Sequence, residues 1–63
     1  MKISLKAARV NANMSQAEVA KLLHKNKQTI INWEKGKTLI DMANLQVLCR
    51  LYGIDENYIF LPN

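Results

Sequence analysis

Chain-breaking residues are scarce in this sequence, which limits the folds open to it. Among its 63 residues there are two glycines, Gly36 and Gly53, and one proline, Pro62. Glycine and proline are the residues that most often interrupt regular structure, so a chain with few of them favours helices joined by tight turns. No segment shows the apolar–polar alternation of a half-buried strand. The sequence therefore predicts an all-α fold without a sheet.

Helical periodicity and capping residues divide the chain into five expected helices. The first has an apolar face with Leu5, Ala8 and Ala12, and Arg9 shares that face. The second follows Ser15-Gln-Ala-Glu18, which matches the capping box, in which each end satisfies a free backbone N–H of the other. Three further capping residues are expected to begin the remaining helices: Asn26, Asp41 and Asp55.

Two glycines are placed to end the third and fourth of these helices. Gly36 and Gly53 can take the left-handed backbone conformation that commonly terminates a helix. The last expected helix is short and holds Tyr58 and Ile59, with Phe60 at or beyond its end.

Chain length and cysteine content exclude several kinds of stabilising site. A chain of 63 residues forms one domain at most, so we expect a single domain over residues 1–63. Cys49 is the only cysteine and His24 the only histidine, which rules out an internal disulfide and a zinc site of thiolates and imidazoles. The sequence shows no signal peptide and no apolar run near the roughly 20 residues of a membrane span. We therefore expect a cytoplasmic protein with no metal, no cofactor and no membrane partner.

Positive charge is concentrated in the first part of the chain. Up to Lys37 there are eight basic and two acidic residues, a balance of +6, whereas from Thr38 onward the balance is −2. A basic region of this kind indicates a polyanionic partner such as nucleic acid. Charge alone leaves ordinary solvated lysines as an equal alternative.

The sequence contains no arrangement typical of a catalytic site. No two carboxylates share a helix face, and there is neither a nucleophile-elbow context nor a glycine-rich phosphate loop. His24 has no obvious partner that would orient it as a general base. We therefore expect no enzyme activity and no small-molecule substrate.

The segment Ser15–Lys37 predicts two helices with a tight join and an amide-rich outer face on the second. Lys27, Gln28 and Asn32 share that face near the start of the helix. Glutamine and asparagine can bond adenine bidentately, and lysine can bond guanine. Such residues suit a helix that reads base edges in the major groove.

The same segment resembles the helix-turn-helix of the Cro and phage-repressor-like family of transcriptional regulators. The matching residues are Gln16, Ala20, the turn at His24, Ile30 and the run Ile31-Asn-Trp33-Glu34-Lys-Gly36-Lys37. Leu45…Leu48-Cys49…Tyr52-Gly53-Ile54 is similar to the family's fourth helix and its exit. The resemblance covers nearly the whole chain. It implies a compact five-helix lambda-repressor-like DNA-binding domain, with the helix-turn-helix at its second and third helices.

The resemblance also implies roles for individual residues. Base contacts are implied for Lys27, Gln28, Thr29 and Asn32, and contacts to the DNA backbone for Gln16, Lys25, Asn26, Lys37, Thr38, Met42 and Ala43. A structural ion pair is implied between Arg9 and Glu34. Two alternatives stay open: Lys27 contacts phosphate alone, or Gln28 and Asn32 are ordinary surface residues.

The implied function is regulation of transcription by occupancy of palindromic operators in double-stranded DNA, as a Cro-like protein or repressor of a bacterium or phage. We expect a weak homodimer that DNA strengthens, with contacts from the less basic C-terminal part: Ile54, Asp55, Glu56, Asn57, Phe60 and Leu61. The alternative function is a protein-interaction module of the same fold, of the antitoxin or antirepressor-target type.

Three features depart from the family's pattern. His24 stands where the family usually has glycine, and we predict a positive φ there and at Asn13, because both residue types tolerate that conformation. Ile31 stands where a polar residue is usual, and either contacts a thymine methyl or is partly covered. The loop 37–41 lacks the usual proline and additional basic residues, and one of Leu39 and Ile40 is expected to enter the core.

Overall fold

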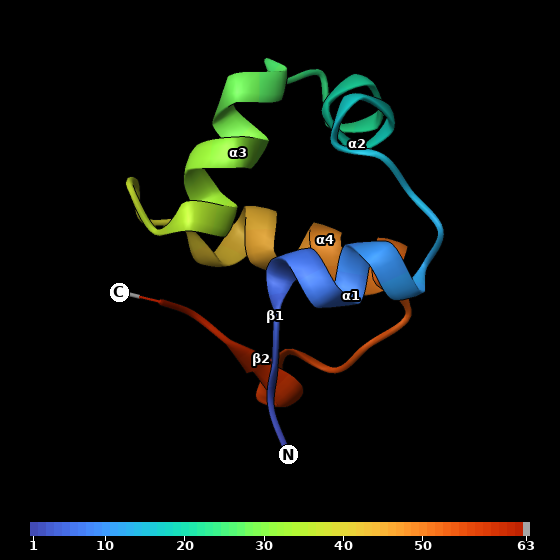
Figure 1. Cartoon of the computed structure of the whole chain (residues 1–63), viewed down its shortest axis with the longest axis vertical. Coiled ribbons are helices and arrows are strands. Elements are labelled where there is room, and N and C mark those ends of the chain that lie inside the picture. The colour runs from blue at the N-terminus through green and yellow to red at the C-terminus, as the bar shows by residue number, and fades with distance from the viewer. Residues whose placement is uncertain (63) are drawn as a thin grey trace.

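The structure is a computed structural model, and it describes residues 1–62 (Figure 1). Within this range the elements are β1 (Ile3–Ser4), α1 (Leu5–Asn11), α2 (Gln16–Leu23), α3 (Lys27–Lys35), α4 (Met42–Tyr52), the 3-10 helix η1 (Glu56–Tyr58) and β2 (Ile59–Phe60). Asn63, the last residue of the expected domain, lies outside the described residues. The fold is mainly helical, and a short turn joins α2 to α3.

The helices begin where the sequence supplies capping side chains. Both halves of the predicted capping box are present, since Ser15 Oγ accepts from the Glu18 backbone N–H at 3.0 Å and Glu18 Oε1 accepts from the Ser15 backbone N–H at 2.9 Å. Asp41 caps α4 and Asp55 caps η1 through their carboxylates, as expected. Asn26 occupies the N-cap position of α3, but its side chain makes no capping hydrogen bond with any described residue.

Four residues with a positive φ end or follow the helices. Gly36 and Gly53 have φ values of 75° and 69°, at the ends of α3 and α4. Asn13 has a φ of 59° and His24 a φ of 55°, which confirms the prediction for both. The chain therefore turns after α1 and α2 without glycine, at the steric cost that a Cβ atom brings in this region.

The join between α2 and α3 uses its backbone to end α2. The Lys25 backbone N–H donates to the Ala20 carbonyl at 2.8 Å, and the His24 N–H donates to the Lys21 carbonyl at 3.2 Å. This is the bonding of a Schellman motif, which satisfies the last carbonyls of a helix and needs a left-handed residue at the turn. The left-handed His24 therefore sets the angle at which α3 leaves α2.

One hydrophobic core connects the four α-helices and the two strands. Its members are Leu5, Ala8, Val19, Ala20, Ile30, Trp33, Leu45, Leu48, Cys49, Tyr52 and Ile59. In the loop before α4, Ile40 packs against this core, while Leu39 is 74% exposed. The expectation that one of these two residues enters the core is met by Ile40.

The expectation of a sheet-free fold is wrong. β1 and β2 form a parallel pair in which Ile3 is the partner of Ile59 and Ser4 is the partner of Phe60. A strand of two residues is too short to show alternation in the sequence, and its partner lies at the other end of the chain. The pairing gives backbone groups next to the buried Ile59 their hydrogen-bond partners.

The expected fifth helix is also corrected. Only Glu56, Asn57 and Tyr58 are helical, in a single 3-10 turn, while Ile59 and Phe60 belong to β2. Ile59 is buried and Phe60 exposed, the two-residue alternation of a strand. The described chain thus has four α-helices where five helices were expected.

The strained turn at His24 leads to a test by substitution. We expect His24→Gly to raise the free energy of unfolding by up to about 1 kcal/mol, or to leave it unchanged, because glycine has no Cβ to clash in the left-handed region. His24→Val is the matched control and should lower it, since a β-branched residue is poorly tolerated there. Urea denaturation measures both. A clear loss of stability in His24→Gly would show that the imidazole makes a stabilising contact.

Candidate nucleic-acid interface

The helices α2 and α3 pack closely and present one side of α3 outward. Ala20 of α2 and Ile30 of α3 are both buried, and an alanine takes up little space in a helix contact. Ile30 and Trp33, three residues apart, turn toward the core. The side of α3 that faces away from the core is consequently free to meet a partner (Figure 1).

The residues expected to contact bases lie on or beside this outer side of α3. Lys27 and Gln28 are exposed, and Thr29 and Asn32 are half-buried. Gln28 Nε2 donates a hydrogen bond to Asn32 Oδ1 at 3.0 Å, one helical turn further along. Ile31 is half-buried as well, which agrees with the expectation that it is partly covered.

The ion pair expected between α1 and α3 is present and buried. Arg9 Nε lies 2.7 Å from Glu34 Oε2, and the two side chains are 10% and 5% exposed. The Arg9 guanidinium also donates to Glu34 Oε1 at 3.3 Å and to the Met14 carbonyl at 2.8 Å. The hydrogen bond to Glu34 is the main cause that raises the pKa of Arg9 above its usual value. Both charges are thus compensated inside the protein.

Gln16, the first residue of α2, joins the same carboxylate. Its Nε2 donates to Glu34 Oε1 at 3.0 Å, so Glu34 holds side chains from α1 and α2 together. Gln16 was expected to contact the DNA backbone. One of its amide hydrogens is used inside the protein, and the other remains available to an acceptor, because a glutamine amide carries two.

The other residues expected at the DNA backbone flank α3 at both of its ends. Lys25 and Asn26 precede α3, Lys37 and Thr38 follow it, and Met42 and Ala43 open α4; all six are exposed. The interface would thus place positive charge before and after the outer side of α3.

The start of α4 is the least favourable part of this set for phosphate. The Asp41 carboxylate accepts from the Asn44 backbone N–H and side chain. The bond from the Asn44 side chain is the main cause that lowers the pKa of Asp41, and the positive charge of Lys25 contributes. A helix N-terminus attracts anions, but here a carboxylate of the protein already lies at it.

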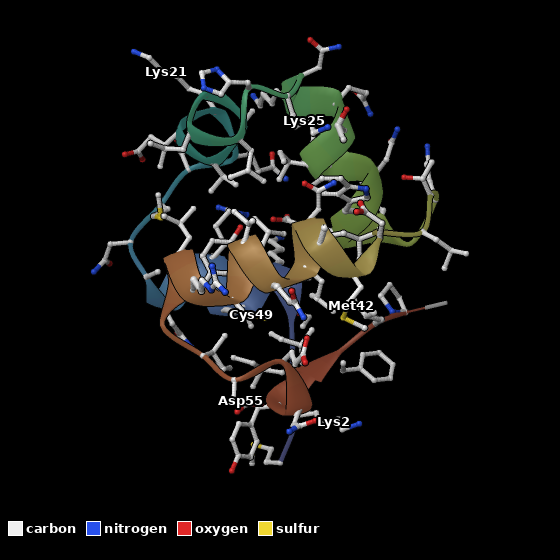
Figure 2. The ribbon with its side chains drawn as sticks, turned by 180° about the vertical axis from the view of Figure 1, so that it is seen from behind. Lys2, Lys21, Lys25, Met42, Cys49 and Asp55 are labelled. Carbon is white, nitrogen blue, oxygen red and sulfur yellow. The ribbon has the colours of Figure 1, made fainter. Side chains whose placement is uncertain are left out.

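The C-terminal residues expected at a dimer interface lie at the other end of the molecule. In Figure 2, Lys21 and Lys25 are at the end formed by α2 and α3, whereas Asp55 and Lys2 are at the opposite end. Ile54, Asp55, Glu56 and Asn57 line a surface cavity of about 580 Å³ next to α4. Phe60 is 56% exposed on β2, and Leu61 packs partly against the core.

Residues 5–59 match the family model described as helix-turn-helix, HTH_3, whose members are Cro- and repressor-type DNA-binding domains. The chain belongs to this helix-turn-helix family. Comparison with curated proteins and with solved structures gave no match. Members of the family are non-catalytic and bind DNA, typically as parts of transcriptional regulators.

Other classes of site find no support in the described part of this helix-turn-helix protein. In residues 1–62, no three His, Cys, Asp or Glu side chains come together as a metal site. No helix in that range is long and apolar enough to cross a membrane. Cys49 is buried, and burial raises the pKa of its thiol, which makes it a poor nucleophile.

Sequence reasoning missed three contacts of the helix-turn-helix. The bond between Gln28 and Asn32 could have been predicted from their spacing, since residues four apart on a helix are neighbours. Nothing in the sequence indicated the bond from Gln16 to Glu34, because it depends on how α2 packs against α3. Nothing indicated the bond from Arg9 to the Met14 carbonyl either, because that bond depends on the path of the turn after α1.

Tyr52 of α4 is an unusual member of the helix-turn-helix core. Its side chain is buried, and its hydroxyl has no hydrogen-bond partner among the described residues. Loss of solvation, followed by the nearby charge of Glu34, raises the pKa of Tyr52 to about 12. The neutral phenol is therefore the form that the fold accepts.

The Arg9–Glu34 pair is tested by a double-mutant cycle. We expect Arg9→Met and Glu34→Gln each to lower the free energy of unfolding by about 3–5 kcal/mol, since each leaves a buried group without its charged partner. The double variant should lose less than the sum of the two. Urea denaturation of the four proteins gives the coupling energy, and simple additivity would contradict this assignment.

Tyr52→Phe tests the unpaired hydroxyl. Removal of a buried hydroxyl without a partner should leave the stability at pH 7 unchanged or raise it by about 1–3 kcal/mol. In the native protein the raised pKa of Tyr52 predicts stability that is complete below pH 10 and falls as the pH rises toward about 12. This alkaline loss should be smaller in Tyr52→Phe and unchanged in Tyr58→Phe, whose side chain is exposed. A less stable Tyr52→Phe at pH 7 would show that the hydroxyl has a partner.

Proposed function

We propose that this protein regulates transcription by binding palindromic operators in double-stranded DNA as a dimer, with α3 in the major groove. The observation that carries the proposal is the outer side of α3. It holds Lys27, Gln28, Thr29 and Asn32 on or beside one surface, with basic residues before and after it. Members of the family bind DNA, which is the coarser activity that this proposal refines.

The proposed base contacts come from the first two turns of α3. Gln28 and Asn32 carry amides, which combine donors and acceptors as base edges do, and Lys27 carries donors for guanine. Thr29, half-buried between them, offers a hydroxyl and a methyl group. Phosphate contacts would come from Gln16, Lys25, Asn26, Lys37, Thr38 and the backbone at Met42 and Ala43, and they would fix the register of α3 on the duplex.

The proposed dimer uses the end of the molecule away from α2 and α3. Ile54, Asp55, Glu56, Asn57, Phe60 and Leu61 contribute the contacts, with the exposed Phe60 ring as the largest apolar group. We expect association in solution to be weak and two adjacent half-sites on DNA to strengthen it. The proposed unit is a single domain over residues 1–63 that represses or switches genes in the cytoplasm of a bacterium or phage-infected cell.

Two observations favour a second candidate function, a protein-interaction module of the same fold. The Asp41 carboxylate lies at the start of α4, and the exposed Leu39 stands in the loop where phosphate contacts are proposed. A module of this kind would bind DNA weakly and with little dependence on salt. An operator-binding regulator loses affinity steeply as salt rises, with a slope of about −0.9 per neutralised phosphate.

Two substitutions separate readout from phosphate binding. We expect Gln28→Ala to cost roughly 1–3 kcal/mol on the preferred site and to relax the preference at one base pair. Lys37→Ala should weaken binding to all sequences about equally and reduce the salt slope by about one unit. Selection from random DNA identifies the preferred site, and fluorescence anisotropy at several salt concentrations measures both effects.

Lys2→Ala is the matched control, because it removes the same charge at the end opposite α2 and α3 (Figure 2). It should change neither affinity nor preference. Unchanged binding of specific and random DNA by Gln28→Ala would show that α3 does not read bases in the proposed way.

A further inference from the structure

Gln28 and Asn32 are joined by a hydrogen bond that restricts both amides. Gln28 Nε2 donates to Asn32 Oδ1 at 3.0 Å. The bond uses one of the four amide hydrogens of the two residues, and it turns the Asn32 oxygen toward Gln28. While this bond is made, the orientation of one amide depends on that of the other.

The atoms left to face a base differ between the two residues. Gln28 keeps its Oε1 acceptor and one N–H donor, whereas Asn32 keeps the two N–H donors of Nδ2. In the major groove adenine offers an acceptor at N7 and a donor at N6, and guanine offers acceptors at N7 and O6. Gln28 thus matches adenine, and Asn32 matches an edge with acceptors alone, guanine or the O4 of thymine.

Resting on the function proposed above, we propose that Asn32 orients the Gln28 amide, so that the two residues read adjoining bases as one coupled unit. Gln28 reads adenine, and Asn32 reads guanine or thymine. A free glutamine amide rotates by half a turn and then offers both donors to guanine. Here that rotation would set Gln28 Oε1 against Asn32 Oδ1, two acceptors, unless Asn32 rotated as well.

The coupling predicts a feature of the operator that would not be expected if Gln28 and Asn32 contacted their bases independently. If both amides rotated together, the hydrogen bond would be kept and the two preferences would exchange. Adenine at both positions is disfavoured in either arrangement, because only one amide oxygen of the pair faces the groove. Asn32 therefore has two roles: it positions the Gln28 amide, and it contacts a base of its own.

The test measures the affinity of the native protein for all combinations of bases at the two positions. Selection from random DNA first gives the operator. Gln28→Ala and Asn32→Ala then identify the base pair that each residue reads, as the one whose preference that variant lowers most. At the Gln28 position we expect a preference for adenine over guanine of roughly 5- to 150-fold, the range for one bidentate contact. Asn32→Ala should reduce that ratio at least about fivefold, although Asn32 does not touch this base.

Asn32→Asp is the matched variant that keeps an acceptor toward Gln28 and loses the two donors. It should retain the adenine preference at the Gln28 position and lose the preference at its own. Its negative charge weakens binding to every sequence, so the ratio between bases is the quantity compared. Circular dichroism and thermal unfolding verify that each variant is folded.

The outcomes separate this inference from the function on which it rests. Absence of any sequence preference in the native protein would overturn both. Sequence-specific binding with an adenine ratio that Asn32→Ala leaves unchanged would overturn the coupling alone. Guanine at the Gln28 position with adenine at the Asn32 position would overturn the assigned orientation. Adenine at the Gln28 position, lost in Asn32→Ala and kept in Asn32→Asp, would support it.

Discussion

Glu34 lies near the end of α3, and its carboxylate receives hydrogen bonds from Arg9 of α1 and Gln16 of α2. Three helices are therefore oriented by one buried anion. A carboxylate in this setting is acceptable only with a compensating cation and satisfied oxygens, and Arg9 supplies both the charge and a bidentate geometry. These hydrogen bonds, together with the buried Ile30 and Trp33, hold α3 against the rest of the protein. The same atoms thus serve the stability of the fold and the placement of the surface proposed to meet DNA.

The two left-handed turns without glycine set the positions of α2. Asn13 precedes it and His24 follows it, each with a positive φ that costs more for these residues than for glycine. The strain is tolerated because the backbone at the His24 turn satisfies the last carbonyls of α2 and the core residues on both sides are buried. A helix of eight residues is marginal by itself, so its length and direction depend on these contacts.

Local chemistry explains what could be predicted from the sequence. Ser15, Asp41 and Gly53 act on backbone groups within four residues of themselves, and their capping and turning roles were therefore visible in the sequence. The pairing of Ile3 with Ile59 joins residues from the two ends of the chain, and neither strand is long enough to carry a pattern. For the same reason the exposed side of α3 could be inferred from periodicity, whereas the bond from Gln16 to Glu34 could not. The family resemblance predicted the Arg9–Glu34 pair. Periodicity alone placed Arg9 on an apolar helix face and gave no partner for its charge.

The parallel pairing of β1 with β2 also has a consequence for how the chain folds. It brings residue 3 beside residue 59, so the pairing closes nearly the whole chain into one loop. Closing a loop costs entropy that grows with its length, and contacts between remote residues slow folding. The contacts of α2 with α3 join residues much closer in the sequence, so they close shorter loops and cost less entropy. The Glu34 hydrogen bonds join α1, α2 and α3 and involve no residue of either strand, so the outer side of α3 and the paired ends of the chain can differ in their local stability.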